Sequence, residues 1–141
     1  MNTLTTPSIS VADRILVVDD IEDNSVLLQV VLEQEGYEVD VANSGRKALD
    51  KVEYHQPDLI LLDVMMPEMN GFEVTQRIRQ NNRIPFIPIL LITGYDQFNS
   101  AEEFEFGADD FIRKPVDFNL LLDRIRTILP EDRNDQAFRS R

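Results

Sequence analysis

Acidic residues stand at the carboxyl ends of two apolar stretches, and their residue type limits the chemistry they can support. Asp19 and Asp20 follow the run Arg14–Val18, and Asp63 follows the run Leu59–Leu62. Carboxylates that cluster repel one another, so they need a nearby cation or a raised pKa. Oxygen ligands without His or Cys close by favour Mg²⁺, which prefers one or two carboxylates together with waters and phosphate oxygens.

Two further polar residues end later apolar stretches. Thr93 closes the run that begins at Ile89, and Lys114 follows Phe111-Ile112-Arg113. A hydroxyl and two cationic centres, Mg²⁺ and the Lys114 ammonium, around a carboxylate suit phosphoryl transfer. This reaction depends mainly on positioning and charge neutralisation. Because a carboxylate can act as the nucleophile and form an acyl phosphate, we expect Asp63 to be the acceptor.

The elements that must bring these residues together alternate between strands and helices. Strands are expected at 14–18, 38–42, 59–62, 89–93 and 111–113, and helices at 24–35, 46–54, 71–80, 99–106 and 117–129. The unbroken apolar run at 59–62 is typical of a strand buried on both faces of a parallel sheet. Five such repeats predict an α/β, doubly wound, five-stranded parallel sheet with flavodoxin-like order 2-1-3-4-5 and helices on both faces. The first and third strands then meet at the switch point, which places the three carboxylates in one crevice.

Length and composition indicate one globular domain. The 141 residues are 43% hydrophobic and 28% charged. We expect a flexible N-terminal arm at 1–13, the folded domain at 14–130 and a polar C-terminal tail at 131–141. The net charge of −12 argues against nucleic-acid binding, and no apolar stretch is long enough to cross a membrane. A soluble, cytoplasmic protein is expected, because the N-terminus has no signal-like pattern either.

Several motifs occupy the expected strand ends and the loop after Asp63. They are Asp19-Asp20, Asp63, Met66-Pro67 with Asn70-Gly71, Thr93, and Lys114-Pro115. In this order they resemble the receiver domain of bacterial two-component response regulators, in the stand-alone form of the chemotaxis regulators. The resemblance covers roughly residues 14–129. It implies a signalling phosphoacceptor, not an enzyme, which takes a phosphoryl group onto Asp63 from a sensor histidine kinase or a histidine phosphotransfer protein.

The resemblance also implies a role for each matching residue. Asp20, Asp63 and the backbone carbonyl of Met65 would bind Mg²⁺, with Asp19 acting mainly through bound water. Thr93 and Lys114 would contact the phosphoryl oxygens.

The same resemblance has implications for four positions, which are Pro115, Phe111, Met65 and Tyr95. The peptide bond before Pro115 would be cis. Phe111 stands where the family often has a tyrosine as its switch residue, so a phenolic hydrogen bond is lacking. Met65 and Tyr95 occupy positions that tune dephosphorylation in the family.

Phosphorylation would be read on the surface formed by the fourth helix, fifth strand and fifth helix, from about residue 99 to 129. A downstream protein or a second copy of the chain, giving a homodimer, would dock there. After Leu129 the sequence has no second globular segment, so no output domain is expected.

Three alternatives remain open at this level. A pseudo-receiver that binds partners without phosphorylation is disfavoured because Asp63, Thr93 and Lys114 are all present. A phosphohydrolase of the haloacid dehalogenase type would carry an Asp two residues after its nucleophile, where this chain has Met65. The third is that the chain is the receiver part of a longer protein.

Overall fold

A parallel sheet of five strands forms the centre of the molecule. The computed structural model describes residues 12–94 and 107–130. The strands are β1 (Arg14–Val18), β2 (Glu38–Ala42), β3 (Leu59–Asp63), β4 (Ile89–Thr93) and β5 (Asp110–Arg113). They lie in the order β2-β1-β3-β4-β5 with parallel pairing throughout. The prediction of a flavodoxin-like α/β sheet is therefore confirmed.

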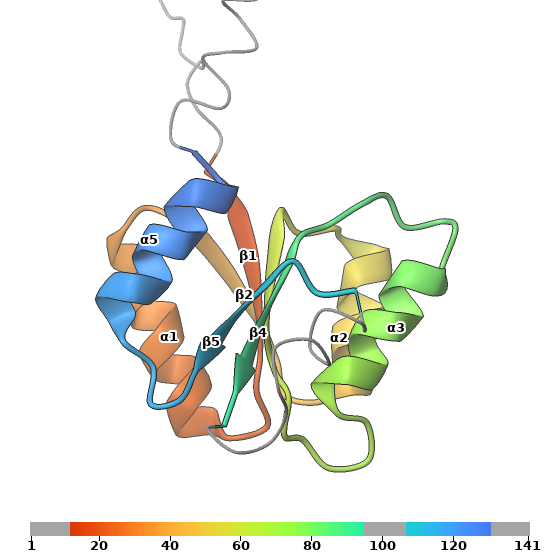
Figure 1. Cartoon of the computed structure of the whole chain (residues 1–141). Helices are drawn as coiled ribbons and strands as arrows, with labels where there is room; N and C mark the ends of the chain where they lie inside the picture. The colour runs from red at the N-terminus through yellow and green to blue at the C-terminus, as the bar shows by residue number, and fades with distance from the viewer. Residues whose placement is uncertain (1–11, 95–106, 131–141) are drawn as a thin grey trace, which may run out of the picture.

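Helices cover both faces of this sheet. They are α1 (Glu22–Gln34), α2 (Gly45–Tyr54), α3 (Gly71–Gln80) and α5 (Phe118–Ile128). Figure 1 shows α1 and α5 on one face and α2 and α3 on the other. The helix expected at 99–106, most of the expected N-terminal arm and the expected tail at 131–141 lie outside the described residues.

Alternation along β3 divides the core between the two faces. Ile60 and Leu62 pack in the cluster under α2 and α3, whereas Leu59 and Leu61 pack in the cluster under α1 and α5. Successive side chains of a strand point to opposite faces, so a strand buried on both sides must be apolar at every position. All five residues of β3 are buried, including Asp63 at its end.

Local signals account for most helix boundaries. The Ser44 hydroxyl accepts a hydrogen bond from the N–H of Lys47 at 3.1 Å and caps α2. Asp117 caps α5 in the same way, so the helix itself begins at Phe118. The expectation for α1 was less accurate. That helix begins at Glu22, two residues before the predicted start, and its N-cap residue provides no side-chain hydrogen bond.

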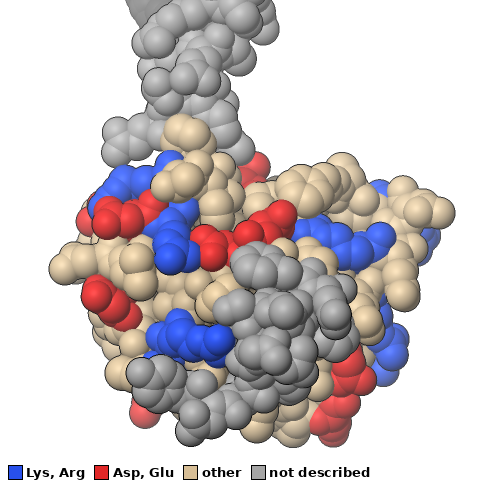
Figure 2. Space-filling model, viewed as in Figure 1, with Lys and Arg blue, Asp and Glu red and all other residues tan. Residues whose placement is uncertain are grey.

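Ion pairs are spread over the surface. Figure 2 shows Lys and Arg side chains lying beside Asp and Glu on the face it presents. Arg124 on α5, for example, contacts the carboxylate of Asp110 on β5 at 2.7 Å. Within the described residues, none of the helices has the length and apolar character needed to cross a membrane.

Candidate functional site

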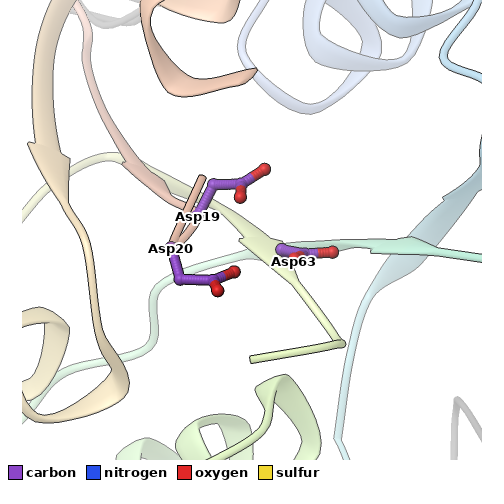
Figure 3. Close-up of side chains that lie close together, drawn as sticks. All are labelled: Asp19, Asp20 and Asp63. Carbon is purple, nitrogen blue, oxygen red and sulfur yellow. The ribbon is translucent and has the colours of Figure 1, made fainter. Parts of the chain in front are cut away.

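Three carboxylates meet at the carboxyl end of the sheet. Asp19 and Asp20 follow β1, and Asp63 ends β3, the neighbouring strand. Figure 3 shows the three side chains lying close together, and one carboxylate oxygen from each lies within 4.8 Å of the others. Asp19 and Asp63 are buried, with 3% and 1% of their surface exposed, whereas Asp20 is exposed. The sheet order therefore brings together the three residues that the sequence singled out.

Backbone hydrogen bonds hold Asp19 in place. Its N–H donates to the carbonyl of Ala42 at 3.1 Å, beyond the end of the β1–β2 ladder. Its carboxylate accepts a hydrogen bond from the N–H of Ile21 at 2.9 Å, just before α1 begins. This local bond stabilises the turn from strand to helix and points the remaining acceptor capacity of Asp19 toward the site.

Asp63 is the most unusual member of the cluster. The Nζ atom of Lys114 approaches its Oδ1 atom to 2.8 Å. This ion pair is short but poorly aligned for hydrogen bonding, and the buried Oδ1 atom has no hydrogen-bond donor among the described residues. Burial raises the pKa of Asp63, and the charge of Asp19 adds to that rise, while Lys114 and the backbone N–H of Met65 oppose it. The net pKa is higher than the ordinary 3.8.

The loop after β3 packs tightly against Asp63. A Cβ atom at Gly71 would lie 2.6 Å from the carbonyl oxygen of Asp63, so only glycine permits this approach. Asn70 and Glu73 form a reciprocal capping box, each side chain accepting a hydrogen bond from the other's backbone N–H at 2.9 Å. The start of α3 is thereby held directly against the end of β3. Met65, between them, is 56% exposed.

Thr93 and Lys114 reach the same edge from the next two strands. Thr93 is fully buried at the end of β4, and its carbonyl accepts a hydrogen bond from the N–H of Lys114 at 2.7 Å. The peptide bond between Lys114 and Pro115 is cis, the isomer that the resemblance implies. Phe111 is partly buried and packs against the core cluster under α2 and α3.

Arg113 is a residue of this region that the sequence reasoning missed. Its Nη1 atom donates a hydrogen bond to the Thr93 hydroxyl oxygen at 3.1 Å, and its guanidinium lies 5.0 Å from the centre of the Phe111 ring. Two features could have indicated it. Arg113 stands two residues after Phe111 in a strand, hence on the same face, and the fifth strand must pair with the fourth.

The donor set suits a hard divalent cation. Every side chain of the acidic cluster offers oxygen, the ligand type that Mg²⁺ prefers. The buried Oδ1 atom of Asp63 also lacks a hydrogen-bond donor among the described residues, which is the condition a cation would relieve. Asp19, Asp20 and Asp63 therefore fit the group expected from the sequence. Tyr95 and the segment 99–106 lie outside the described residues.

A groove gives access to this site from solvent. Its volume is about 300 Å³, and it lies between α1 and the segment after β5. Asp19 and Lys114 line the groove at the site, and Leu27, Pro115 and Phe118 form part of its apolar wall. On α1, Leu27 and Val30 are about half exposed, at 51% and 47%.

Comparison with known proteins matches nearly the whole of the expected folded domain. Residues 15–126 match the family model described as the response regulator receiver domain. The chain is 44% identical over 117 residues to the alkaline phosphatase synthesis transcriptional regulatory protein PhoP of Bacillus subtilis, covering 82% of this chain and 48% of that protein. It is 41% identical over 126 residues to the DNA-binding dual master transcriptional regulator RpaA of Synechocystis, covering 88% of this chain and 52% of RpaA.

Solved structures agree in fold. A CheY-like response regulator receiver domain protein from Methanospirillum hungatei superposes with a TM-score of 0.78 at 33% identity, covering 89% of this chain and 99% of that one. The chain thus matches that receiver over nearly its whole length, but spans only about half the length of PhoP and RpaA.

Proposed function

Because the chain belongs to the response regulator receiver family of two-component systems, we propose that it accepts a phosphoryl group on Asp63 from a phosphohistidine of a sensor histidine kinase or a histidine phosphotransfer protein. The observation that carries this proposal is the buried carboxylate of Asp63, 2.8 Å from the Lys114 ammonium and within reach of two other carboxylates. The protein is a signalling phosphoacceptor whose own chemistry is limited to gaining and losing that group.

The transfer is a single displacement at phosphorus. A carboxylate oxygen of Asp63 forms the new bond to phosphorus, the bond from phosphorus to the donor imidazole nitrogen breaks, and the imidazole takes up a proton. Lys114 stabilises negative charge on the phosphoryl oxygens, since its ammonium already lies at the carboxylate. Burial of Asp63 strengthens this attraction by keeping water from the carboxylate, while the Lys114 side chain remains 34% exposed.

Asp19, Asp20, Asp63 and the backbone carbonyl of Met65 would hold Mg²⁺. Bound there, Mg²⁺ would neutralise charge on the carboxylates and on the incoming phosphoryl oxygens. Without a cation, burial raises the pKa of Asp63, and repulsion from Asp19 adds to that rise. The acidic residues therefore serve both to bind the cation and to make phosphorylation depend on it.

Thr93 and Phe111 would report the phosphorylated state. The Thr93 hydroxyl and the Lys114 ammonium would move onto the phosphoryl oxygens, and Phe111 would turn inward into the space that Thr93 leaves. Hydrogen bonds to charged groups contribute about 1.5–3 kcal/mol each, so two supply roughly 3–6 kcal/mol. Shifting a two-state equilibrium from 1:99 to 99:1 requires about 5.5 kcal/mol, which is within that range.

Partners would use two surfaces. The phosphohistidine donor would approach along the groove beside α1, where Leu27 lines the groove and offers exposed apolar contact. A downstream protein, or a second copy in a homodimer, would dock on the expected fourth helix with β5 and α5. Leu120 of α5 is 41% exposed on the described part of that second surface.

Intact-mass measurement tests the proposal. After incubation with acetyl phosphate and Mg²⁺, we expect one phosphoryl addition to the wild-type chain and none to Asp63→Asn. Chelation of Mg²⁺ should suppress the addition. The matched control is Asp50→Asn, since Asp50 is an exposed carboxylate on α2; it should be labelled like wild type. An unmodified wild-type chain would indicate a pseudo-receiver.

The loss of the phosphoryl group gives a second test of the site. Met65 is apolar and cannot position a water for attack on the acyl phosphate, so we expect slow dephosphorylation. Replacement by Asn or Glu should shorten the half-life of the labelled chain, followed by mass after removal of the donor. Equal half-lives in wild type, Met65→Asn and Met65→Glu would contradict this role of the position.

A further inference from the structure

Arg113 makes contacts that the proposed phosphoryl transfer does not use. It lies directly opposite Thr93 in the ladder between β4 and β5. Its Nη1 atom donates to the Thr93 hydroxyl oxygen at 3.1 Å and lies 3.5 Å from the carbonyl of Gly94. Its guanidinium carbon is 5.0 Å from the centre of the Phe111 ring, within the range of a cation–π attraction. One side chain therefore contacts both residues expected to report phosphorylation.

The sheet order determines what this contact means for Thr93. Strand β4 lies between β3 and β5. Arg113 pairs with Thr93 itself, whereas Asp63 on the other side pairs with Ile92, the residue before Thr93. A threonine side chain occupies one of a few staggered rotamers, and its hydroxyl cannot lie toward both neighbours at once. In the structure the hydroxyl oxygen lies toward Arg113. Reaching a phosphoryl group on Asp63 would require rotation away from β5 and loss of this hydrogen bond.

The two adjacent cations of β5 therefore face different partners. The Lys114 ammonium lies at the carboxylate of Asp63, at 2.8 Å. The Arg113 guanidinium lies at Thr93 and over the Phe111 ring. Phosphorylation would add a partner for Lys114 but take one from Arg113. Lys114 would therefore favour the phosphorylated conformation, whereas Arg113 would favour the resting one.

We propose that Arg113 is a positioning residue that stabilises the resting conformation, by holding the Thr93 hydroxyl on the β5 side and the Phe111 ring against its guanidinium. This inference rests on the proposed function of Asp63. It adds that the threshold for switching is determined in part by a side chain that touches neither the phosphoryl group nor the cation. Removing the guanidinium should make the active conformation easier to reach.

The experiment uses the full chain with Mg²⁺ and beryllium fluoride, a mimic of the phosphoryl group. Arg113→Met keeps the length of the side chain and removes the charge and the donors. We expect its apparent Kd for the mimic to fall roughly three- to tenfold, the effect of one partly exposed charged hydrogen bond. Without the mimic, the amide signals of Thr93 and Phe111 should already be displaced toward their mimic-saturated positions.

The sign of the change in Kd separates this role from simple electrostatics. Beryllium fluoride at a carboxylate carries negative charge, so loss of a nearby positive charge alone would raise the Kd. The matched control is Arg83→Met, which changes the net charge equally but removes an 83% exposed side chain paired with Glu53. Its Kd and amide positions at Thr93 should equal those of wild type.

Two further variants test the route through Thr93. Arg113→Lys keeps a charge and a donor, and should restore part of the wild-type Kd. In a Thr93→Ala background, Arg113→Met should cause little further change, because the hydrogen bond is already missing. Should Arg113→Met fail to fold by thermal unfolding, Arg113→Leu, which also lacks charge and donors, replaces it with the same expectation.

The outcomes distinguish this inference from the function on which it rests. If wild type responds to the mimic and Arg113→Met has an equal or higher Kd, the role of Arg113 is wrong while the receiver function stands. If wild type shows no Mg²⁺-dependent response, both the proposed function and this inference are wrong. A lower Kd that persists unchanged in the Thr93→Ala background would also overturn the inference, since Arg113 would then act by another route.

Discussion

Charged side chains at the two ends of the sheet differ in how far they are satisfied by hydrogen-bond partners. At the amino ends of β4 and β5, Arg79 donates to the carbonyls of Gly107 and Ile87 and to the carboxylate of Asp109, at 2.7–3.0 Å. The same oxygen of Asp109 accepts a hydrogen bond from the N–H of Ile89 at 2.8 Å, where β4 begins. At the carboxyl end, Asp63 is buried beside other carboxylates with one oxygen that lacks a donor among the described residues.

This difference separates a structural use of charge from a functional one. A partly buried polar group stabilises the fold when it finds hydrogen-bond partners, and each nitrogen of the Arg79 guanidinium donates one hydrogen bond. An incomplete and repulsive arrangement costs free energy, which a cation or a phosphoryl group can recover on binding. Under the proposed function, this cost at the carboxyl end is what allows a ligand to stabilise it.

The largest effect should come from the amino end. Replacing Arg79 with Met leaves the carbonyls of Gly107 and Ile87 without this donor and removes one of the two donors to Asp109, and we expect a loss of about 2–4 kcal/mol in the free energy of unfolding. Denaturant unfolding measures this loss. Arg83→Met, at an exposed ion pair, should change the same quantity by less than about 0.5 kcal/mol. Equal effects of the two variants would remove the distinction between the two ends of the sheet.

Mg²⁺ should stabilise the carboxyl end by a similar amount. A cation that binds only the folded chain adds about 2.7 kcal/mol at a hundredfold excess over its Kd. Asp20→Ala removes one proposed ligand and one repelling charge. Its melting temperature should therefore lie above that of wild type in chelator and rise less with Mg²⁺. A metal response equal to that of wild type would place the cation elsewhere.

Asp63→Asn should stabilise the chain in chelator at neutral pH, by about 1 kcal/mol, the lower limit of the cost of a buried group without a donor. Burial, the larger cause, and Asp19 raise the pKa of Asp63 above 3.8, so between 3.8 and the raised value the folded state binds more protons than the unfolded state. Wild-type stability then falls as pH rises through that window. The variant should lack this fall in urea unfolding across the acidic range, and a parallel pH profile would count against it.

The smallest effect should come from Asp40 on β2. Burial raises the pKa of Asp40, but the hydrogen bonds from Lys51, at 2.7 Å, and from the N–H of Val41 lower it by more. The net pKa therefore lies below 3.8. This pair stabilises the fold above that pH, and the contribution is lost as pH falls through the lowered pKa. Asp40→Asn should cost about 0.5 kcal/mol at neutral pH and progressively less as pH falls below 3.8, since the pair is partly exposed. Urea unfolding at neutral pH and below pH 3.8 checks this difference.

The residue pattern alone was enough to predict the sheet and the candidate site. Unbroken apolar runs such as Leu59–Leu62 must be buried on both faces, which requires a parallel sheet covered by helices. Parallel strands end at one edge, so polar residues at the ends of several runs must meet there. The prediction of Asp19, Asp20 and Asp63 as neighbours follows from these apolar runs, because the burial of a strand can be predicted from its own residues.

Contacts between particular atoms were decided only by the tertiary structure. The pairing of Arg113 with Thr93 depends on the register of β5 against β4 and on one rotamer, neither of which leaves a periodic signal. The hydrogen bonds of Arg79 join α3 to residues 28 positions away, and the close contact of Gly71 with Asp63 depends on how α3 packs. Hydrophobic periodicity specifies which face of an element is buried, whereas directional hydrogen bonds between distant segments exist only once the packed fold has brought donor and acceptor together.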